Sequence, residues 1–158
     1  YIRTREGFIY LALIMDLYSR KIVGYHSGDT LECIGCLEAL NMASRTLRPC
    51  DAHLIHHSDR GCQYACHEYV SRLETLGITL SMTEVNHCYE NAHAERLNGI
   101  LKQEYGLNYE HISKAQCCAH IQEAITLYNE VRLHASHQYR TPFSVYAESE
   151  RKDVSQPV

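Results

Sequence analysis

The chain has 158 residues, a formal net charge of −4, 45% hydrophobic residues and 22% charged residues. This composition is that of one globular domain, and the negative charge disfavours a basic protein that coats nucleic acid. No apolar run approaches the ~18 residues of a membrane span, and no signal peptide opens the chain. We therefore expect a cytoplasmic domain without membrane contact, whose eight cysteines stay reduced and form no disulfide framework.

Apolar runs predict two strands and a helix in the first third of the chain. Residues 8–17 are almost continuously apolar, which is typical of a central strand covered on both faces. Residues 21–26 form a second, β-branched run after a turn at Ser19-Arg20, so the two runs predict a hairpin. Residues 30–47 carry apolar side chains at helical spacing and predict a helix.

The rest of the chain alternates between predicted strands and helices. Residues 53–57 are expected to form a buried parallel strand, reached by a helical crossover. The later predicted elements are a helix at 67–76, a strand at 78–82, a polar mobile loop at 83–90, a helix around Glu95, a helix at 113–132, a turn at Thr141-Pro142 and a disordered tail at 151–158. This order predicts an α/β domain with a mixed sheet flanked by helices.

Two carboxylates stand out as candidate site residues. Asp59 follows the predicted strand and precedes Gly61, which places it where the strand ends and the backbone turns. Glu95 falls early in its helix, after Asn91 as a plausible N-cap, and shares one helix face with Asn98 and Lys102. A carboxylate and a cation on one surface suit a metal that holds a phosphate. Taken alone, Asp59 fits a turn residue equally well, and Glu95 a solvated helix residue.

The spacing of these two residues resembles a known family. Thirty-five residues separate Asp59 from Glu95, and Glu95 lies in the motif Asn-Ala-x-x-Glu-x-x-Asn-Gly-x-Leu-Lys-x-Glu. This pattern resembles the retroviral-integrase-type catalytic core of bacterial insertion-sequence transposases, the DDE enzymes. The fragments that match the same family in the same order are residues 16–25, 39–43 and 57–64, Ser81-Met82, Tyr128-Asn129, Arg132, His134 and Thr141-Pro142.

The resemblance implies an RNase H-like fold and a DNA-processing activity. Such cores cleave DNA at transposon ends and transfer the strands into target DNA, and they act as homo-oligomers. Their carboxylates hold two Mg²⁺ (or Mn²⁺) ions, for which hard oxygen ligands are suited. The resemblance assigns catalysis and metal binding to Asp59 and Glu95, and DNA contact to Lys102, Asn98 and Arg60. His57 is expected to orient the metal ligands without binding the metal itself.

The sequence departs from the family pattern at two acidic positions. The first catalytic Asp of the family would fall three residues before Tyr1, so residues 1–147 are expected to be a catalytic core that lacks most of its first strand, with 148–158 as a tail. We expect this chain alone to bind Mg²⁺ weakly and not to join DNA strands. Asp16 is given a structural role, with Arg20 as a plausible partner. Glu90 stands where the family has Asp and is not assigned to catalysis.

Other interpretations of the sequence remain open. An RNase H-like nuclease shares the fold and the metal chemistry, and a non-catalytic binding or oligomerisation remnant of a transposase shares the sequence pattern. The Cys33/Cys36 and Cys62/Cys66 pairs suggest zinc, but buried reduced cysteines explain them better. Arg132 and His134 either pack the last helix on the sheet or contact DNA, and we favour packing.

Overall fold

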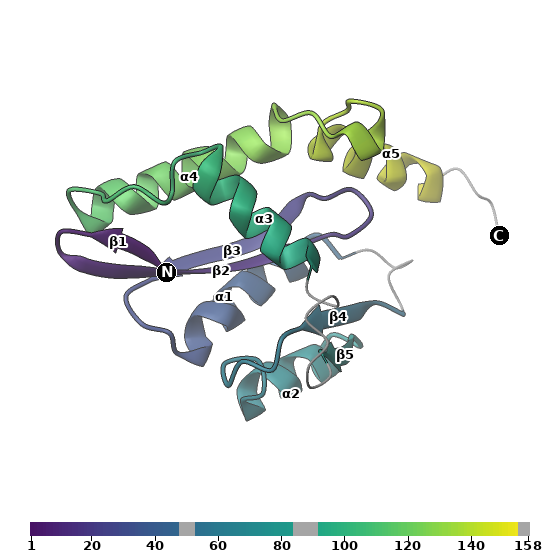
Figure 1. The fold of residues 1–158 in the computed structure, drawn as a ribbon. Helices are drawn as coiled ribbons and strands as arrows, with labels where there is room; N and C mark the ends of the chain where they lie inside the picture. The colour runs from purple at the N-terminus through teal and green to yellow at the C-terminus, as the bar shows by residue number, and fades with distance from the viewer. Residues whose placement is uncertain (48–52, 84–91, 155–158) are drawn as a thin grey trace.

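The structure is a computed structural model that describes residues 1–47, 53–83 and 92–154 (Figure 1). No helix within these ranges has both the length and the hydrophobicity to span a bilayer. The elements in chain order are β1 (Ile2–Thr4), β2 (Gly7–Met15), β3 (Ile22–Gly28), α1 (Cys33–Ser44), β4 (Ile55–Ser58), α2 (His67–Thr75), β5 (Thr79–Met82), α3 (Ala92–Gln103), α4 (Lys114–Glu130), a 3₁₀ turn (Ala135–His137) and α5 (Pro142–Val154).

The strands form two sheets. β1, β2 and β3 make an antiparallel sheet in that order, with Ile2 opposite Ile9 and Leu13 opposite Tyr25. β4 and β5 make a parallel pair in which His57 lies opposite Ser81, and α2 forms the crossover between them. The sequence correctly predicted both antiparallel and parallel pairing, but it predicted a single mixed sheet.

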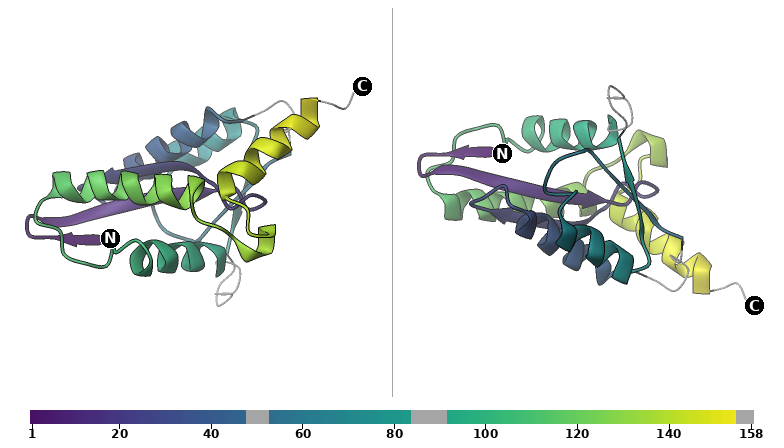
Figure 2. Two further views of the ribbon diagram at one scale, coloured as in Figure 1. Left: turned by 90° about the horizontal axis from the view of Figure 1, so that it is seen from above. Right: turned by 90° about the horizontal axis from the view of Figure 1, so that it is seen from below.

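Helices cover both faces of the three-stranded sheet. Figure 1 shows α3 and α4 above the sheet and α1 below it, and the view from above in Figure 2 shows α4 running along the strands. Alternate residues of β2 serve the two sides: Leu11, Leu13 and Met15 pack against the core under α3 and α4, whereas Ala12 and Ile14 pack against the core of α1 and α2. The predicted central strand with two covered faces is therefore confirmed.

The sheet allows α1 to approach closely because β3 carries a glycine at the contact. A Cβ atom on Gly24 would lie 2.1 Å from the carbonyl oxygen of Ala39 in α1. Leu40 and Cys36 of the same helix are buried in the core that α1 shares with Tyr69 and Leu73 of α2. The glycine thus sets the distance between the sheet and the α1 layer.

Several boundaries differ from the sequence predictions. α1 begins at Cys33 rather than at 30. β4 is not a buried strand, because the Ile55 side chain is 64% exposed and Ser58 is its only buried residue; one of its edges has no partner strand among the described residues. The predicted loop at 83–90, Glu90 and the cap Asn91 lie, apart from Thr83, outside the described residues.

The last described element is a helix, where the sequence predicted only a turn and a tail. α5 has 13 residues and runs to Val154, across the expected boundary at 147. Thr141 caps it, since its Oγ1 accepts a hydrogen bond from the Ser144 N–H at 3.2 Å. Val145 and Tyr146 are buried, which gives the helix an anchoring face.

Hydrogen bonds between Asp16 and Ser19 stabilise the turn after β2. The Asp16 carboxylate accepts hydrogen bonds from both the backbone N–H and the hydroxyl of Ser19, and Ser19 is fully buried. Arg20 adopts φ 67°, and its backbone N–H donates to the Asp16 carbonyl at 2.8 Å. The structural role predicted for Asp16 is confirmed, but its side-chain partner is Ser19 and not Arg20.

Replacing Gly24 with Ala tests the close contact between β3 and α1. Because the new methyl group meets backbone atoms of α1, Gly24→Ala should lower the free energy of unfolding by about 3 kcal/mol. The matched control is Gly99→Ala in α3, where a Cβ meets nothing within 4 Å and where Ala should raise the free energy of unfolding by about 0.5–1 kcal/mol. Chemical denaturation of both variants measures this, and equal effects would contradict the contact.

Candidate functional site

Asp59 lies at the carboxyl end of β4, as the sequence predicted. Its side chain is exposed, and its Oδ1 accepts a hydrogen bond from the Gly61 N–H at 2.9 Å. This local turn orients the carboxylate through a bond within its own segment. Carboxylate oxygens such as those of Asp59 are good ligands for a hard cation.

Glu95 lies in the first turn of α3, and its side chain is exposed. Leu97, Ile100 and Leu101 of α3 are buried in the core with α4, which leaves Glu95 on the outer side of the helix. The predicted early helical position is confirmed. A negative charge in the first turn is also stabilised by the helix dipole.

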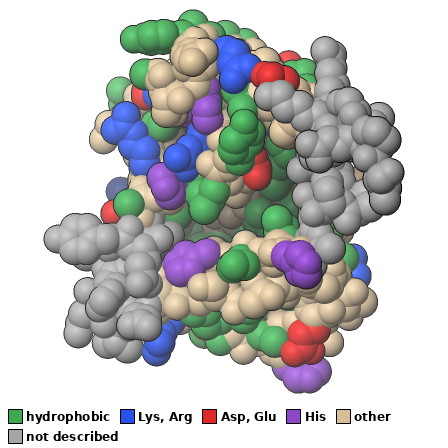
Figure 3. Space-filling view, turned by 90° about the vertical axis from the view of Figure 1, so that its right-hand side faces the viewer, with side chains coloured by type: hydrophobic (Ala, Val, Ile, Leu, Met, Phe, Trp, Pro, Cys, Tyr) green, Lys and Arg blue, Asp and Glu red, His purple; other side chains and the backbone are tan. Residues whose placement is uncertain are grey.

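A cleft of about 640 Å³ opens between the two sheets. Its walls include Leu11 and Leu13 of β2, and Figure 3 shows a hollow with hydrophobic side chains inside and histidines on its lower rim. The polar residues at the cleft include Asp16, Ser44, Thr46, His56, His57, Ser58, Asp59, His93 and Asn98.

The cleft brings together some of the predicted site residues and not others. Asp59, Asn98 and His57 line it, whereas Glu95, Lys102 and Arg60 are not among its lining residues. Within the described ranges, no group of three metal-ligating side chains joins Asp59 to Glu95. The roles given to these residues stay predictions.

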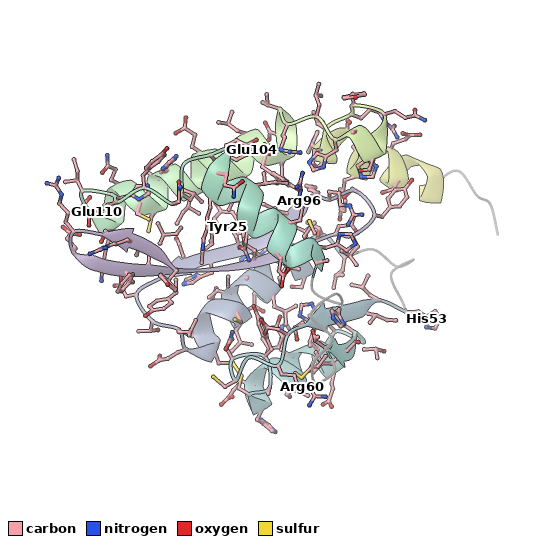
Figure 4. The ribbon with its side chains drawn as sticks, viewed as in Figure 1. Tyr25, His53, Arg60, Arg96, Glu104 and Glu110 are labelled. Atoms are coloured by element: carbon pink, nitrogen blue, oxygen red, sulfur yellow. A yellow bond between two sulfur atoms is a disulfide. The ribbon has the colours of Figure 1, made fainter. Side chains whose placement is uncertain are left out.

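The three predicted DNA contacts are exposed and come from two parts of the fold, since Asn98 and Lys102 lie on α3 and Arg60 follows β4. Arg60 donates from Nε to the Thr83 carbonyl at 2.8 Å, and Figure 4 shows it beside α2. Lys102 on α3 has its Nζ 5.9 Å from the centre of the Tyr1 ring. Asn98 is exposed, and it borders the cleft.

His57 and its neighbour His56 have separate partners. His57 faces β5, with Nδ1 3.0 Å from the Ser81 hydroxyl and Nε2 3.4 Å from the Thr83 hydroxyl. His56 faces α2, and its Nε2 lies 3.0 Å from the buried Tyr69 hydroxyl. Neighbouring residues of a strand point to opposite faces of the sheet, and these two rings have partners on different elements accordingly.

The sequence did not predict a contact between Arg20 and His93 at the cleft. The Arg20 guanidinium lies 2.9 Å from Nδ1 of His93, which lines the cleft. The two residues are 73 positions apart, and Arg20 adopts a left-handed backbone conformation with φ 67°. No local sequence signal indicates such a contact.

The motif at the end of α4 is engaged within the protein. The Asn129 side chain accepts from the Ile22 N–H at 2.9 Å and donates to the Ile22 carbonyl at 3.0 Å. Arg132 forms a two-bond ion pair with Glu104, at 2.7 and 2.8 Å, which holds the pKa of Glu104 below its usual range. These contacts favour the packing role over DNA contact.

His134 belongs to the same cluster. Its Nε2 lies 3.2 Å from Nη1 of Arg132, and its ring packs edge-on to the buried Tyr128 ring. Burial, followed by the Arg132 charge, lowers the pKa of His134 to about 4. The ring is therefore neutral at pH 7, and its Nε2 accepts a hydrogen bond from the Arg132 guanidinium.

Two cysteines are joined, contrary to the sequence prediction. Cys33 at the start of α1 and Cys66, the residue before α2, form a disulfide with Cα atoms 6.6 Å apart. Both side chains are partly buried rather than fully in the core. The sequence could not predict this, because 33 positions separate the pair and only the packing of α1 on α2 aligns them.

Comparisons with known proteins agree on one family. Two models described as integrase core domain match residues 1–88 and 76–142. The protein of insertion element IS600 from Shigella sonnei is 41% identical over 85% of this chain and 50% of its own length. The transposase of IS904 from Lactococcus lactis is 34% identical over 90% of this chain and 56% of its own length. The chain therefore spans about half the length of these relatives.

Solved structures show the same fold. The catalytic core domain of BIV integrase matches with a TM-score of 0.69 and 18% identity, over 97% of this chain and 93% of that one. The HTLV-2 integrase catalytic core domain in complex with magnesium matches with a TM-score of 0.69 and 17% identity, over 91% and 88%. These likenesses establish the RNase H-like fold.

The partly buried His56 should make the fold sensitive to acid. Burial, followed by the neighbouring His57, lowers the pKa of His56 to about 4, below the ordinary value of about 6.5. The contribution of the neutral His56 ring to the free energy of unfolding is thus fully present above pH ~6.5 and is lost as the pH falls towards 4. His56→Gln keeps a hydrogen-bonding group and should reduce the loss of unfolding free energy between pH 8 and 5 by about 1–2 kcal/mol. The control variant is His67→Gln, on the exposed surface of α2, and a parallel response of the two variants would contradict the assignment.

Proposed function

The chain belongs to the integrase core domain family, as a DDE-type core of an insertion-sequence transposase, and we propose on that premise that it carries out metal-dependent phosphoryl transfer on DNA during transposition. The reaction would comprise cleavage at transposon ends and strand transfer into target DNA. The observation that carries the proposal is the exposure of Asp59 and Glu95 at a strand end and a helix start, with the family spacing between them.

The two carboxylates fit the ions that this chemistry needs. Both offer exposed oxygen donors, which Mg²⁺ and Mn²⁺ prefer, and the Gly61 N–H holds the Asp59 carboxylate in one direction. When bound, a pair of such ions activates the attacking oxygen and stabilises the leaving oxygen. The part of Asp59 and Glu95 is to hold the ions and to neutralise their charge.

We propose that a third carboxylate comes from a segment N-terminal to Tyr1. β1 pairs with β2 in a register that places Ile2 opposite Ile9. The same register would place a residue three positions before Tyr1 opposite Leu13, which lines the cleft that Asp59 also lines. Asp16 is a poor substitute because Ser19 engages its carboxylate. This chain alone would then bind metal weakly and not join DNA strands.

DNA would be the partner of this surface. Arg60 and Lys102 provide exposed positive charge, and Asn98 provides an amide at the cleft. Arg96 adds an exposed cation on α3 (Figure 4). We propose that these groups contact phosphates near the carboxylates and that the protein acts as a homo-oligomer on two transposon ends. An RNase H-like nuclease and a non-catalytic remnant are the alternative outcomes of the tests below.

The metal site is tested by titrating Mn²⁺ into this chain and into a chain extended upstream through the expected Asp. The extended chain should bind at least about tenfold tighter, because a third carboxylate completes the ligand set. Asp59→Asn and Glu95→Gln should each remove that gain, whereas Glu123→Gln on the exposed side of α4 should not. Equal affinity in all the variants would show that the family likeness marks only a fold.

Activity of the extended chain separates the enzyme classes. Incubation with Mg²⁺, a DNA duplex that ends in the element's terminal sequence, and plasmid DNA should yield joined products in the wild type and none in Glu95→Gln. Cleavage without joining would support a nuclease. A folded, metal-binding chain with neither activity would support the remnant.

Lys102→Ala tests the DNA surface. Loss of one phosphate contact should weaken DNA binding for all sequences and reduce the slope of log K against log salt concentration by about 1. The control is Lys114→Ala, since Lys114 is paired with Asp29 away from the cleft. Fluorescence anisotropy at several salt concentrations measures both, and an unchanged slope in Lys102→Ala would remove this residue from the interface.

A further inference from the structure

The N-terminal ends of α1 and α2 meet at a cluster of sulfur and oxygen ligands. Cys33 opens α1, Cys66 is the N-cap of α2, and Glu68 lies in the first turn of α2. The Sγ atoms and a Glu68 carboxylate oxygen all lie within 4.8 Å of one another. Within the described residues, this is the one group of three metal-ligating side chains that lie so close together.

We propose that the reduced chain binds a thiophilic divalent cation, with Zn²⁺ as the best fit, through Cys33, Cys66 and Glu68. Two thiolates and a carboxylate form a donor set that zinc accepts, and three protein ligands leave the fourth tetrahedral position to water. The proposed site is separate from the Asp59 and Glu95 carboxylates, and it goes beyond the proposed function.

The backbone is already placed for such a site. The Cα atoms of Cys33 and Cys66 are 6.6 Å apart. Two sulfurs bound to one tetrahedral zinc lie about 3.8 Å apart, given Zn–S bonds of about 2.3 Å. Once the disulfide is reduced, small side-chain rotations therefore bring the two sulfurs to the spacing that zinc needs, and α1 and α2 keep their packing.

The helix ends favour the charged form of the ligands. Cys33 and Glu68 lie in the first turns of α1 and α2, and Cys66 caps α2. No side-chain cap hydrogen bond satisfies either helix end. The free N–H groups of a helix start stabilise negative charge, so both thiolates and the carboxylate gain from their positions.

Two neighbouring cysteines are not assigned as ligands. Cys36 is buried one turn after Cys33, and burial, opposed by a hydrogen bond with Tyr64, raises the pKa of its thiol. Cys62 is exposed, and its Sγ lies 3.7 Å from the Gln63 side-chain oxygen. Neither belongs to the cluster of three.

The chemistry of loading is a reduction followed by an exchange of protons for metal. A phosphine or thiol reductant delivers two electrons to the S–S bond, and the sulfurs take up two protons to give two thiols. Each thiol then releases its proton as its sulfur binds the cation. A bound ion would link α1 to α2. Because the segment that begins at Asp59 ends at α2, the ion would also restrain the C-terminal end of that segment.

Titration of Co²⁺ and Zn²⁺ into the chain reduced with a phosphine tests the site. We expect one Co²⁺ per chain with a thiolate-to-cobalt charge-transfer band, which Zn²⁺ removes by displacement. Zn²⁺ at about 100 times its Kd should raise Tm by about 5 °C or more. Cys33→Ser and Cys66→Ser should weaken binding at least about 100-fold, and Glu68→Gln should weaken it about tenfold.

Matched variants separate a ligand from a neighbour. Cys62→Ser, in the segment before α2, and Glu74→Gln, in the last turn of α2, change exposed residues outside the cluster and should bind as the wild type does. If a Cys33 or Cys66 variant does not fold, Zn²⁺ should still protect both thiols of the wild type from alkylation, as read by mass spectrometry of peptides. The proposal is overturned by a reduced chain that shows no charge-transfer band, by a band that survives Cys33→Ser, or by thiols that Zn²⁺ leaves unprotected.

Discussion

The two-sided packing of β2 is the constraint on which the rest of the structure depends. Its odd-numbered residues from Leu11 to Met15 face the core under α3 and α4, and Ala12 and Ile14 face the core of α1 and α2. One edge of β2 is paired with β3 along most of its length, whereas β1 covers only the first three residues of the other edge. Backbone groups of a strand between two cores need partners, so the edge beyond Ile9 is the natural place for a further strand.

The sequence predicted the elements best where local chemistry decides them. The run of apolar residues marked β2, the Asp59-Gly61 turn marked the end of β4, and Ser113 marked the start of α4, where its hydroxyl accepts from the Gln116 N–H at 3.1 Å. Each of these signals needs only neighbours in the chain. The position of Asp59 was predictable for the same reason, since its hydrogen bond to Gly61 spans two residues.

The predictions failed where distant residues decide the outcome. The division into two sheets depends on which edges meet, and strand patterns carry no such information. The Cys33–Cys66 bridge and the contact between Arg20 and His93 join residues 33 and 73 positions apart. α5 is a different case, because proline at the first helical position after a threonine cap is a local helix-start signal. Val145 and Tyr146, both buried, supply the apolar face that a turn does not need.

The two candidate carboxylates belong to different halves of the molecule. Glu95 is positioned by α3, whose Leu97 and Leu101 are buried in the core with α4. Asp59 is positioned by β4 and by the segment that runs to α2, where Tyr64 packs against Tyr69 in the other core. The distance between the carboxylates is therefore set by how β2 holds the two cores together. A strand added between β2 and β4 would pair with edges that have no partner strand among the described residues and would fix that distance, so the proposed metal site and the sheet would be completed together.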